Sequence, residues 1–264
     1  MPLLRTAEQE QESNRPTPRR PFAERIFKKV SETHNFEPLS AESLQNLAEA
    51  NQLLAKEALI IYVNHTSTSD AAVAITLALS HLTNARHFMA PAGMKHYDLT
   101  RDPMNAILLR SLRLLNIQVM PVVQHNDLEN YPPKKKERMI QQLKKKAQRF
   151  LNKPRSIYGI TPEGTRNKKT GELLEGRPGL GKLEKHAPQT IKYLPIAIIY
   201  EKYSDKPQIV VGKPETLGSV TNSLEVTLPE EENARAKKIT DILMYKLSLL
   251  MPQNLKGQYS DYNP

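Results

Sequence analysis

The feature that most constrains the fold is an apolar, partly β-branched run, Ala58–Val63, that is followed closely by a second apolar segment at 71–79. The first run predicts a buried strand. Ser67 and Ser69 are residue types that cap helices, and they stand just before the second segment, which predicts a helix there. A strand followed at once by a helix start is the place where open α/β sheets bind their ligands.

Two chemically active side chains lie at this junction. His65 falls just after the predicted strand, and Asp70 stands five residues later at the start of the predicted helix. In that geometry the carboxylate can fold back onto one ring nitrogen, which leaves the other nitrogen free to accept a proton from a substrate hydroxyl. The spacing alone is a weak signal. A loop histidine beside a first-turn acid that the helix dipole favours is the alternative.

A second polar loop follows a second predicted strand. The run Arg155–Ile160 leads into a loop at 162–166 with the sequence Pro-Glu-Gly-Thr-Arg. Gly164 allows the backbone to approach a ligand closely, and the planar guanidinium of Arg166 suits a phosphate. Glu163 is expected to hold that arginine or a neighbouring donor in place. The alternative is a tight turn that carries a solvated arginine.

Together the two motifs resemble the glycerolipid acyltransferase family, whose best-known members acylate glycerol 3-phosphate and 1-acylglycerol 3-phosphate. The resemblance covers roughly residues 55–215 and includes a proline-containing strand predicted at 193–199. In that family the histidine is the catalytic base and the aspartate orients it, which implies these roles for His65 and Asp70. The second motif helps to bind the phosphate of the acceptor, which implies this role for Glu163, Gly164, Thr165 and Arg166.

The sequence departs from the family pattern after a strand predicted at 117–123. The family usually has an arginine there that aids acceptor binding, whereas this chain continues with Gln124-His125. His125 is the candidate replacement for that cation, and Lys95 matches a lysine often found at its place in the family. The acceptor therefore stays open between a glycerol phosphate, a lysophospholipid and a lysolipid without a phosphate.

The resemblance implies transfer of a fatty acyl group from acyl-CoA or acyl carrier protein to a hydroxyl of the acceptor, a step of phospholipid biosynthesis. We expect direct attack, because the sequence has no cysteine and no Gly-x-Ser-x-Gly segment to form a covalent intermediate. The histidines show no spacing typical of a metal site. We therefore expect no metal and no cofactor apart from the acyl donor, which is a substrate.

The order of the predicted elements is that of an α/β protein with a single mixed, mostly parallel sheet flanked by helices and preceded by an N-terminal helical segment. Residues 1–21 are polar and are expected to form a disordered tail. We predict N-terminal helices over 22–56, with Ser40 as the cap of the second helix. The acyltransferase domain is expected over 57–252 and a tail over 253–264.

The net charge of +10 predicts an anionic partner. On a helical wheel, the segment 134–151 has an apolar side that includes Ile140 and is expected to face the core, and an opposite side with four cations. These cations are Lys134, Arg138, Lys145 and Arg149. Contact with an anionic membrane surface and a merely solvated face are both open interpretations. The segment 22–30 is likewise either an interfacial helix or a helix packed on the domain.

No apolar stretch reaches the roughly 20 residues that span a bilayer. We therefore expect a cytoplasmic protein, peripheral at the inner membrane face, without a transmembrane helix. A basic binding protein without catalysis, for an anionic surface or a nucleic acid, is the rival class. No RNA- or DNA-binding motif supports a nucleic-acid partner, and the aromatic content is low.

Overall fold

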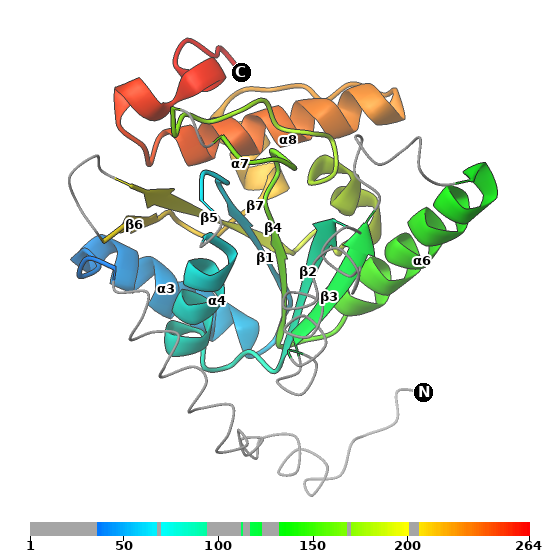
Figure 1. Cartoon of the computed structure of the whole chain (residues 1–264), viewed down its shortest axis with the longest axis horizontal. Coiled ribbons are helices and arrows are strands. Elements are labelled where there is room, and N and C mark those ends of the chain that lie inside the picture. The colour runs from blue at the N-terminus through cyan, green and yellow to red at the C-terminus, as the bar shows by residue number, and fades with distance from the viewer. Residues whose placement is uncertain are drawn as a thin grey trace, which may run out of the picture.

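The computed structural model describes residues 36–67, 70–93, 112, 117–122, 132–167, 170–200 and 206–264. The predicted α/β fold class is confirmed, because a single sheet of mostly parallel strands lies between helices (Figure 1). Among these residues no helix has both the length and the apolar character needed to cross a membrane. The tail at 1–21 and the segment 22–30 lie outside the described residues.

Five neighbouring strands of the sheet are parallel. The strand order is β3-β2-β4-β1-β5-β6, and the short β7 also pairs with β5. β6 and β7 are antiparallel to β5. The strands are β1 (Leu59–Val63), β2 (His87–Gly93), β3 (Ile117–Val122), β4 (Ser156–Ile160), β5 (Lys192–Ile199), β6 (Gln208–Val211) and β7 (Glu215–Thr216).

β1 is the central strand, and all of its residues are buried. Successive side chains of a strand point to opposite faces of the sheet. Ile60 and Tyr62 therefore join the core on one face, while Leu59, Ile61 and Val63 join the core on the other. A strand that is covered on both faces has to be apolar without interruption, which explains the run seen in the sequence.

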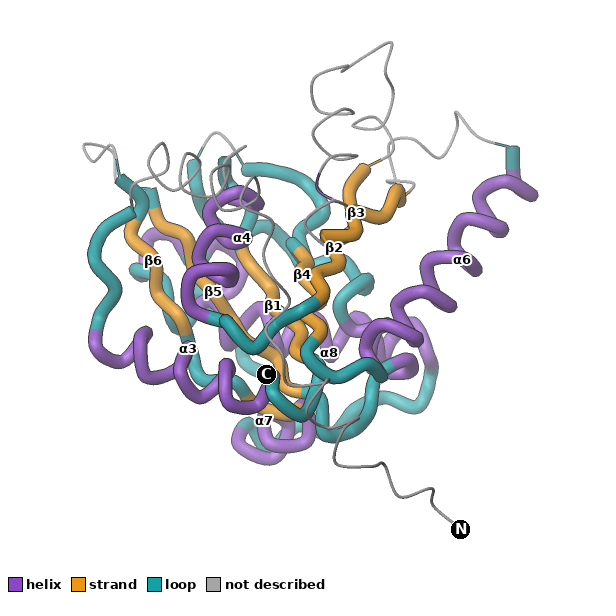
Figure 2. Tube along the Cα trace, turned by 90° about the horizontal axis from the view of Figure 1, so that it is seen from below, coloured by secondary structure: helices purple, strands orange, loops and turns teal. Residues whose placement is uncertain are grey.

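Helices cover both faces of the sheet (Figures 1 and 2). The core that contains Leu59 is closed by α3 (Ala41–Leu54) and α4 (Asp70–His81). The opposite core is closed by α6 (Pro133–Leu151), the 3-10 helix η4 (Gly181–His186) and α8 (Glu232–Ser248). The short α7 (Leu217–Ser223) follows β7. Ser40 caps α3 as predicted, because its side chain accepts the N–H of Ser43.

The burial of α6 differs from the wheel at one position. Ile140 lies on the predicted apolar side, yet it is 47% exposed, so that prediction is wrong. The buried residues of α6 are Ala147, Phe150 and Leu151, near its C-terminal end. The N-terminal half of the helix, to which Ile140 belongs, extends away from the sheet (Figure 2).

The residues after 252, which we expected to form a tail, make two 3-10 helices, η5 (Gln253–Leu255) and η6 (Gly257–Tyr259). Tyr259 is buried, and its hydroxyl accepts the N–H of Gly176 and donates to Asp241. These contacts fasten the C-terminal residues to α8 and to the chain segment that follows β4.

The order of the parallel strands brings both sequence motifs to one edge of the sheet. β1 lies between β4 and β5, and Tyr62 pairs with Ile160 and with Pro195. The three strands run in the same direction, so their carboxyl ends lie side by side. The loop after β1, the loop after β4 and the residue after β5 therefore meet at the edge where such sheets place their ligands.

Candidate active site

His65 and Asp70 lie together at the carboxyl edge of β1. His65 follows the strand by two residues, and Asp70 is the first residue of α4. The ring Nδ1 of His65 faces Oδ2 of Asp70 at 3.2 Å, as the spacing predicts. Asp70 is completely buried, whereas the His65 side chain is 21% exposed. The nitrogen that does not face the carboxylate, Nε2, is thus the one that can serve a substrate.

The Asp70 carboxylate accepts hydrogen bonds on both of its oxygens. The backbone N–H groups of Thr66 and Ser67 donate to Oδ2, each at 2.7 Å. The hydroxyl of Tyr200, directly after β5, donates to Oδ1 at 2.9 Å. Several donors on a buried carboxylate fix its orientation. The same bonds occupy the two backbone N–H groups that follow His65.

Glu163 joins the second motif to the first. Its Oε1 accepts the backbone N–H of His65 at 2.9 Å, and its Oε2 accepts the N–H of Leu174 at 3.4 Å. Glu163 is 1% exposed, and burial raises its pKa to about 8, against the lowering effect of the two N–H donors. Glu163 was expected to hold either Arg166 or a neighbouring donor. It holds a neighbouring donor, the backbone N–H of His65. A side chain buried in this way supports the loop and does not present its carboxylate to a ligand.

The loop at 162–166 turns tightly around Gly164. The glycine N–H bonds to the carbonyl of Thr161, and its φ of +65° lies in the left-handed region, where a side chain would be strained. The side chain of Arg177 packs against Gly164, and its Nε donates to the carbonyl of Glu163. Thr165 is exposed and Arg166 is partly exposed. The loop thus presents a hydroxyl and a guanidinium to solvent beside a braced backbone.

Backbone contacts hold the two motif loops at a fixed distance. The N–H of Asn167 donates to the carbonyl of His65 at 3.1 Å, so His65 is bound through both of its backbone groups. Asn64, buried at the end of β1, donates to the carbonyl of Ile198 at 2.8 Å and accepts its N–H at 2.7 Å. These bonds fix the backbone on both sides of the imidazole.

Two expected site residues, Lys95 and His125, lie outside the described residues. Tyr200 and Asn64 are the contributors that sequence reasoning missed, although Asn64 directly precedes His65. The position of Tyr200 directly after a predicted strand is a signal that could have identified it. The part of the chain that the structure describes contains no cluster of three or more His, Asp or Glu side chains able to hold a metal ion.

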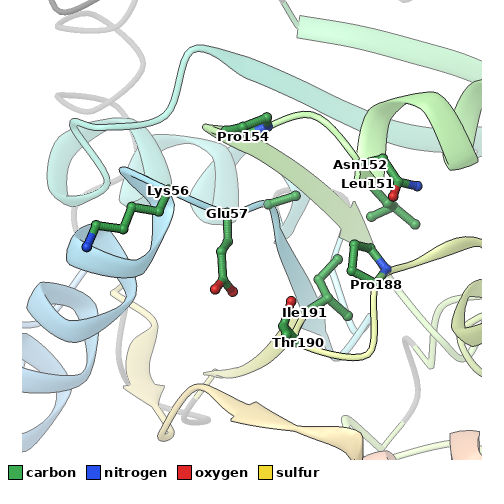
Figure 3. A pocket seen from close by; sticks show the side chains of 9 residues that line it. Lys56, Glu57, Leu151, Asn152, Pro154, Pro188, Thr190 and Ile191 are labelled. Atoms are coloured by element: carbon green, nitrogen blue, oxygen red, sulfur yellow. The ribbon is translucent and has the colours of Figure 1, made fainter. Parts of the chain in front are cut away.

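A cavity of about 190 Å³ lies at the opposite edge of the same strands (Figure 3). Its lining comes from the residues that precede three strands: Glu57 and Ala58 before β1, Pro154 before β4, and Ile191 before β5. Because parallel strands have their two ends on opposite sides of the sheet, this cavity is separate from His65 and Asp70.

The chain matches a family model described as Acyltransferase over residues 34–199, which is more than half of its length. The matched region contains both motif loops and all five parallel strands. A comparison with curated proteins finds no match.

Proposed function

The chain belongs to the acyltransferase family, and from this premise we propose that it moves a fatty acyl group from acyl-CoA or acyl carrier protein to a hydroxyl of a glycerol phosphate or lysophospholipid. The contact between His65 Nδ1 and the buried Asp70 carboxylate is the observation that carries the proposal. A step of this kind belongs to phospholipid biosynthesis.

In the proposed reaction His65 is the general base. Asp70 favours the tautomer with the proton on Nδ1, so Nε2 keeps a lone pair. The acceptor oxygen attacks the thioester carbonyl while its proton moves to Nε2. The C–S bond then breaks, and the thiol leaves with that proton. General-base help of this kind contributes typically ~10²–10⁴-fold to the rate.

The second motif is proposed to bind the acceptor. Arg166 forms no hydrogen bond or ion pair within the described residues and is partly exposed, so its guanidinium is available for a phosphate. Thr165 and the backbone at Gly164 lie beside it. Lys95 and His125 are proposed as additional cations. Glu163 is buried, and we assign it to holding His65 and the loop in place.

The identity of the acceptor is the finer part of the proposal. The arginine that the family usually carries after the strand at 117–122 is replaced here by Gln124-His125. A lysolipid without a phosphate is therefore the second candidate acceptor, because it needs fewer cations than a glycerol phosphate does.

We propose an anionic membrane as the partner surface. Lys134, Arg138, Lys145 and Arg149 are all exposed along one side of α6, and within the described residues none of them forms an ion pair. Each cation near an anionic bilayer contributes about 1 kcal/mol. Replacement of these four residues by Gln should abolish flotation with phosphatidylglycerol vesicles. The matched control replaces Lys56, Lys153, Lys182 and Lys213, and equal loss in both variants would contradict the assignment.

The experiment that tests the function is thiol release from a long-chain acyl-CoA and, in parallel, from acyl carrier protein. Glycerol 3-phosphate, 1-acylglycerol 3-phosphate and a lysolipid without a phosphate are offered separately. We expect acceptor-dependent release with at least one of them. Salt-sensitive binding to oligonucleotides or vesicles without any thiol release would instead support the non-catalytic rival.

A further inference from the structure

Tyr200 stands directly after β5, one residue beyond the region matched by the family model. Its hydroxyl donates to Oδ1 of Asp70 at 2.9 Å. We propose that Tyr200 is a positioning residue that completes a chain of hydrogen bonds, Tyr200–Asp70–His65, and thereby keeps the base in its active form. The inference rests on the proposed function of this site.

The two oxygens of Asp70 have different partners. Oδ2 accepts two backbone N–H groups and faces the imidazole. Oδ1 has Tyr200 as its donor, and the described residues supply no other donor to it. Without the tyrosine hydroxyl, the negative charge on Oδ1 has no donor, so the carboxylate attracts the proton on Nδ1 more strongly. A stronger attraction favours the imidazolium form of His65, which cannot act as a base.

Tyr200 remains a donor over the working pH range. Burial, followed by the nearby charge of Asp70, raises the pKa of its phenol above the ordinary value, so the hydroxyl keeps its proton. The side chain of Ser67 also hydrogen-bonds to the phenol. The hydroxyl is thus held between the loop after β1 and the first residue of α4, while the residue as a whole remains 37% exposed.

Three titratable groups face Asp70 from separate elements. His65 comes from the loop after β1, Glu163 from the loop after β4, and Tyr200 from the end of β5. Burial raises the pKa of Glu163 to about 8, so we expect its ionisation on the basic side of a pH–rate profile. A change at Tyr200 acts on the acidic side, where the base becomes protonated.

Tyr200→Phe removes one oxygen from a partly exposed side chain, and we expect the fold to be kept, as judged by circular dichroism. We expect kcat to fall about 10- to 100-fold with the KM of both substrates nearly unchanged. The acidic limb of the profile should move to higher pH by roughly one unit, because a carboxylate that has lost a donor stabilises the imidazolium of His65 more strongly. Tyr245→Phe makes the same atomic change on α8 and should alter neither quantity.

A second variant keeps the hydrogen bond from residue 200 to Asp70 and changes its strength. Site-specific replacement of Tyr200 by 3-fluorotyrosine makes the phenol a stronger donor, so the acidic limb should move to lower pH, opposite to Tyr200→Phe. A residue with only a packing role cannot move the limb in both directions. The proposal would be overturned if Tyr200→Phe kept the wild-type kcat and the wild-type position of the acidic limb. It would also be overturned if both replacements moved that limb in the same direction.

NMR of the His65 ring separates this inference from the proposed function, because it needs no substrate. In Tyr200→Phe the ring signals should change at a higher pH than in the wild type and in Tyr245→Phe. An unchanged His65 titration would overturn the role of Tyr200, even if acyl transfer by the wild type is demonstrated. A changed titration would support that role, even if the wild type transfers no acyl group.

Discussion

The two edges of β4, β1 and β5 use buried carboxylate oxygens in opposite ways. At the carboxyl edge, Asp70 and Glu163 are buried, and both oxygens of each accept hydrogen bonds. At the amino edge, Oε2 of Glu57 is buried and finds no donor among the described residues, although a cavity lies beside it. The edge with the cavity is thus not the edge with the organised carboxylates.

This contrast indicates what distinguishes the candidate active site. A carboxylate whose oxygens are all satisfied has a fixed direction and can orient an imidazole. Figure 3 shows the Glu57 side chain extending into the cavity at the amino edge, where the described contacts do not fix its carboxylate. The organisation of polar groups, rather than empty volume, therefore distinguishes the candidate active site at the carboxyl edge.

Asp70→Asn should have the largest effect, because an amide has one accepting oxygen where the carboxylate has two. The amide therefore cannot accept hydrogen bonds on both sides and also keep Nδ1 of His65 as a donor. We expect kcat to fall by about 10²–10⁴-fold, measured as thiol release at saturating substrate. Circular dichroism should report an intact fold. A near wild-type kcat in this variant would show that the carboxyl edge does not take part in the reaction.

Arg166→Ala tests the exposed guanidinium of the same edge. Loss of a charge-assisted bond to the acceptor phosphate should raise the KM for the acceptor about 10- to 100-fold, while the KM for acyl-CoA stays close to its wild-type value. The control is Arg138→Ala, which removes an exposed arginine on α6. It is assayed with glycerol 3-phosphate in the absence of vesicles. An unchanged acceptor KM would favour the acceptor without a phosphate.

Glu163→Gln should change the pH dependence of stability. Burial raises the pKa of Glu163 from 4.5 to about 8, so the native state keeps a proton that the unfolded chain has lost. The free energy of unfolding should therefore fall as the pH rises from 4.5 to 8, by at most about 1.4 kcal/mol per pH unit. Glutamine cannot ionise, and urea unfolding between these pH values should show a flatter slope. Equal slopes in both proteins would show that Glu163 is ionised throughout.

Glu57→Gln should have the smallest effect and serves as the matched control for Glu163. Its carboxylate supports no described loop at the reactive edge, so we expect kcat within about twofold of the wild type. The free energy of unfolding should change by less than about 1 kcal/mol. A large loss of acyl transfer in this variant would reverse the comparison between the two edges.

The fold was predictable because its main signals are local. β1 is an uninterrupted apolar run because both of its faces are buried, and Ser40 caps α3 through a residue three positions away. The wheel for α6 separated its two sides correctly but misjudged Ile140. Amphipathic periodicity says which side faces inward, not how far the sheet extends beneath the helix.

The site was predictable only as far as neighbours in the sequence define it. The contact of His65 with Asp70 spans five residues, whereas Glu163 reaches the backbone of a residue 98 positions earlier and Tyr200 reaches Asp70 across 130 positions. Such pairings depend on the order of β4, β1 and β5 in the sheet, which no local pattern specifies. The cavity beside Glu57 depends on that order in the same way.

The most direct test of the account is the effect of His65→Ala on formation of acylated product. Wild-type protein and variant are incubated with acyl-CoA and the acceptor that supports thiol release, and the product is quantified by mass spectrometry. We predict product from the wild type and an initial rate at least about 100-fold lower from a folded His65→Ala. Equal initial rates from the two proteins would contradict His65 as the base.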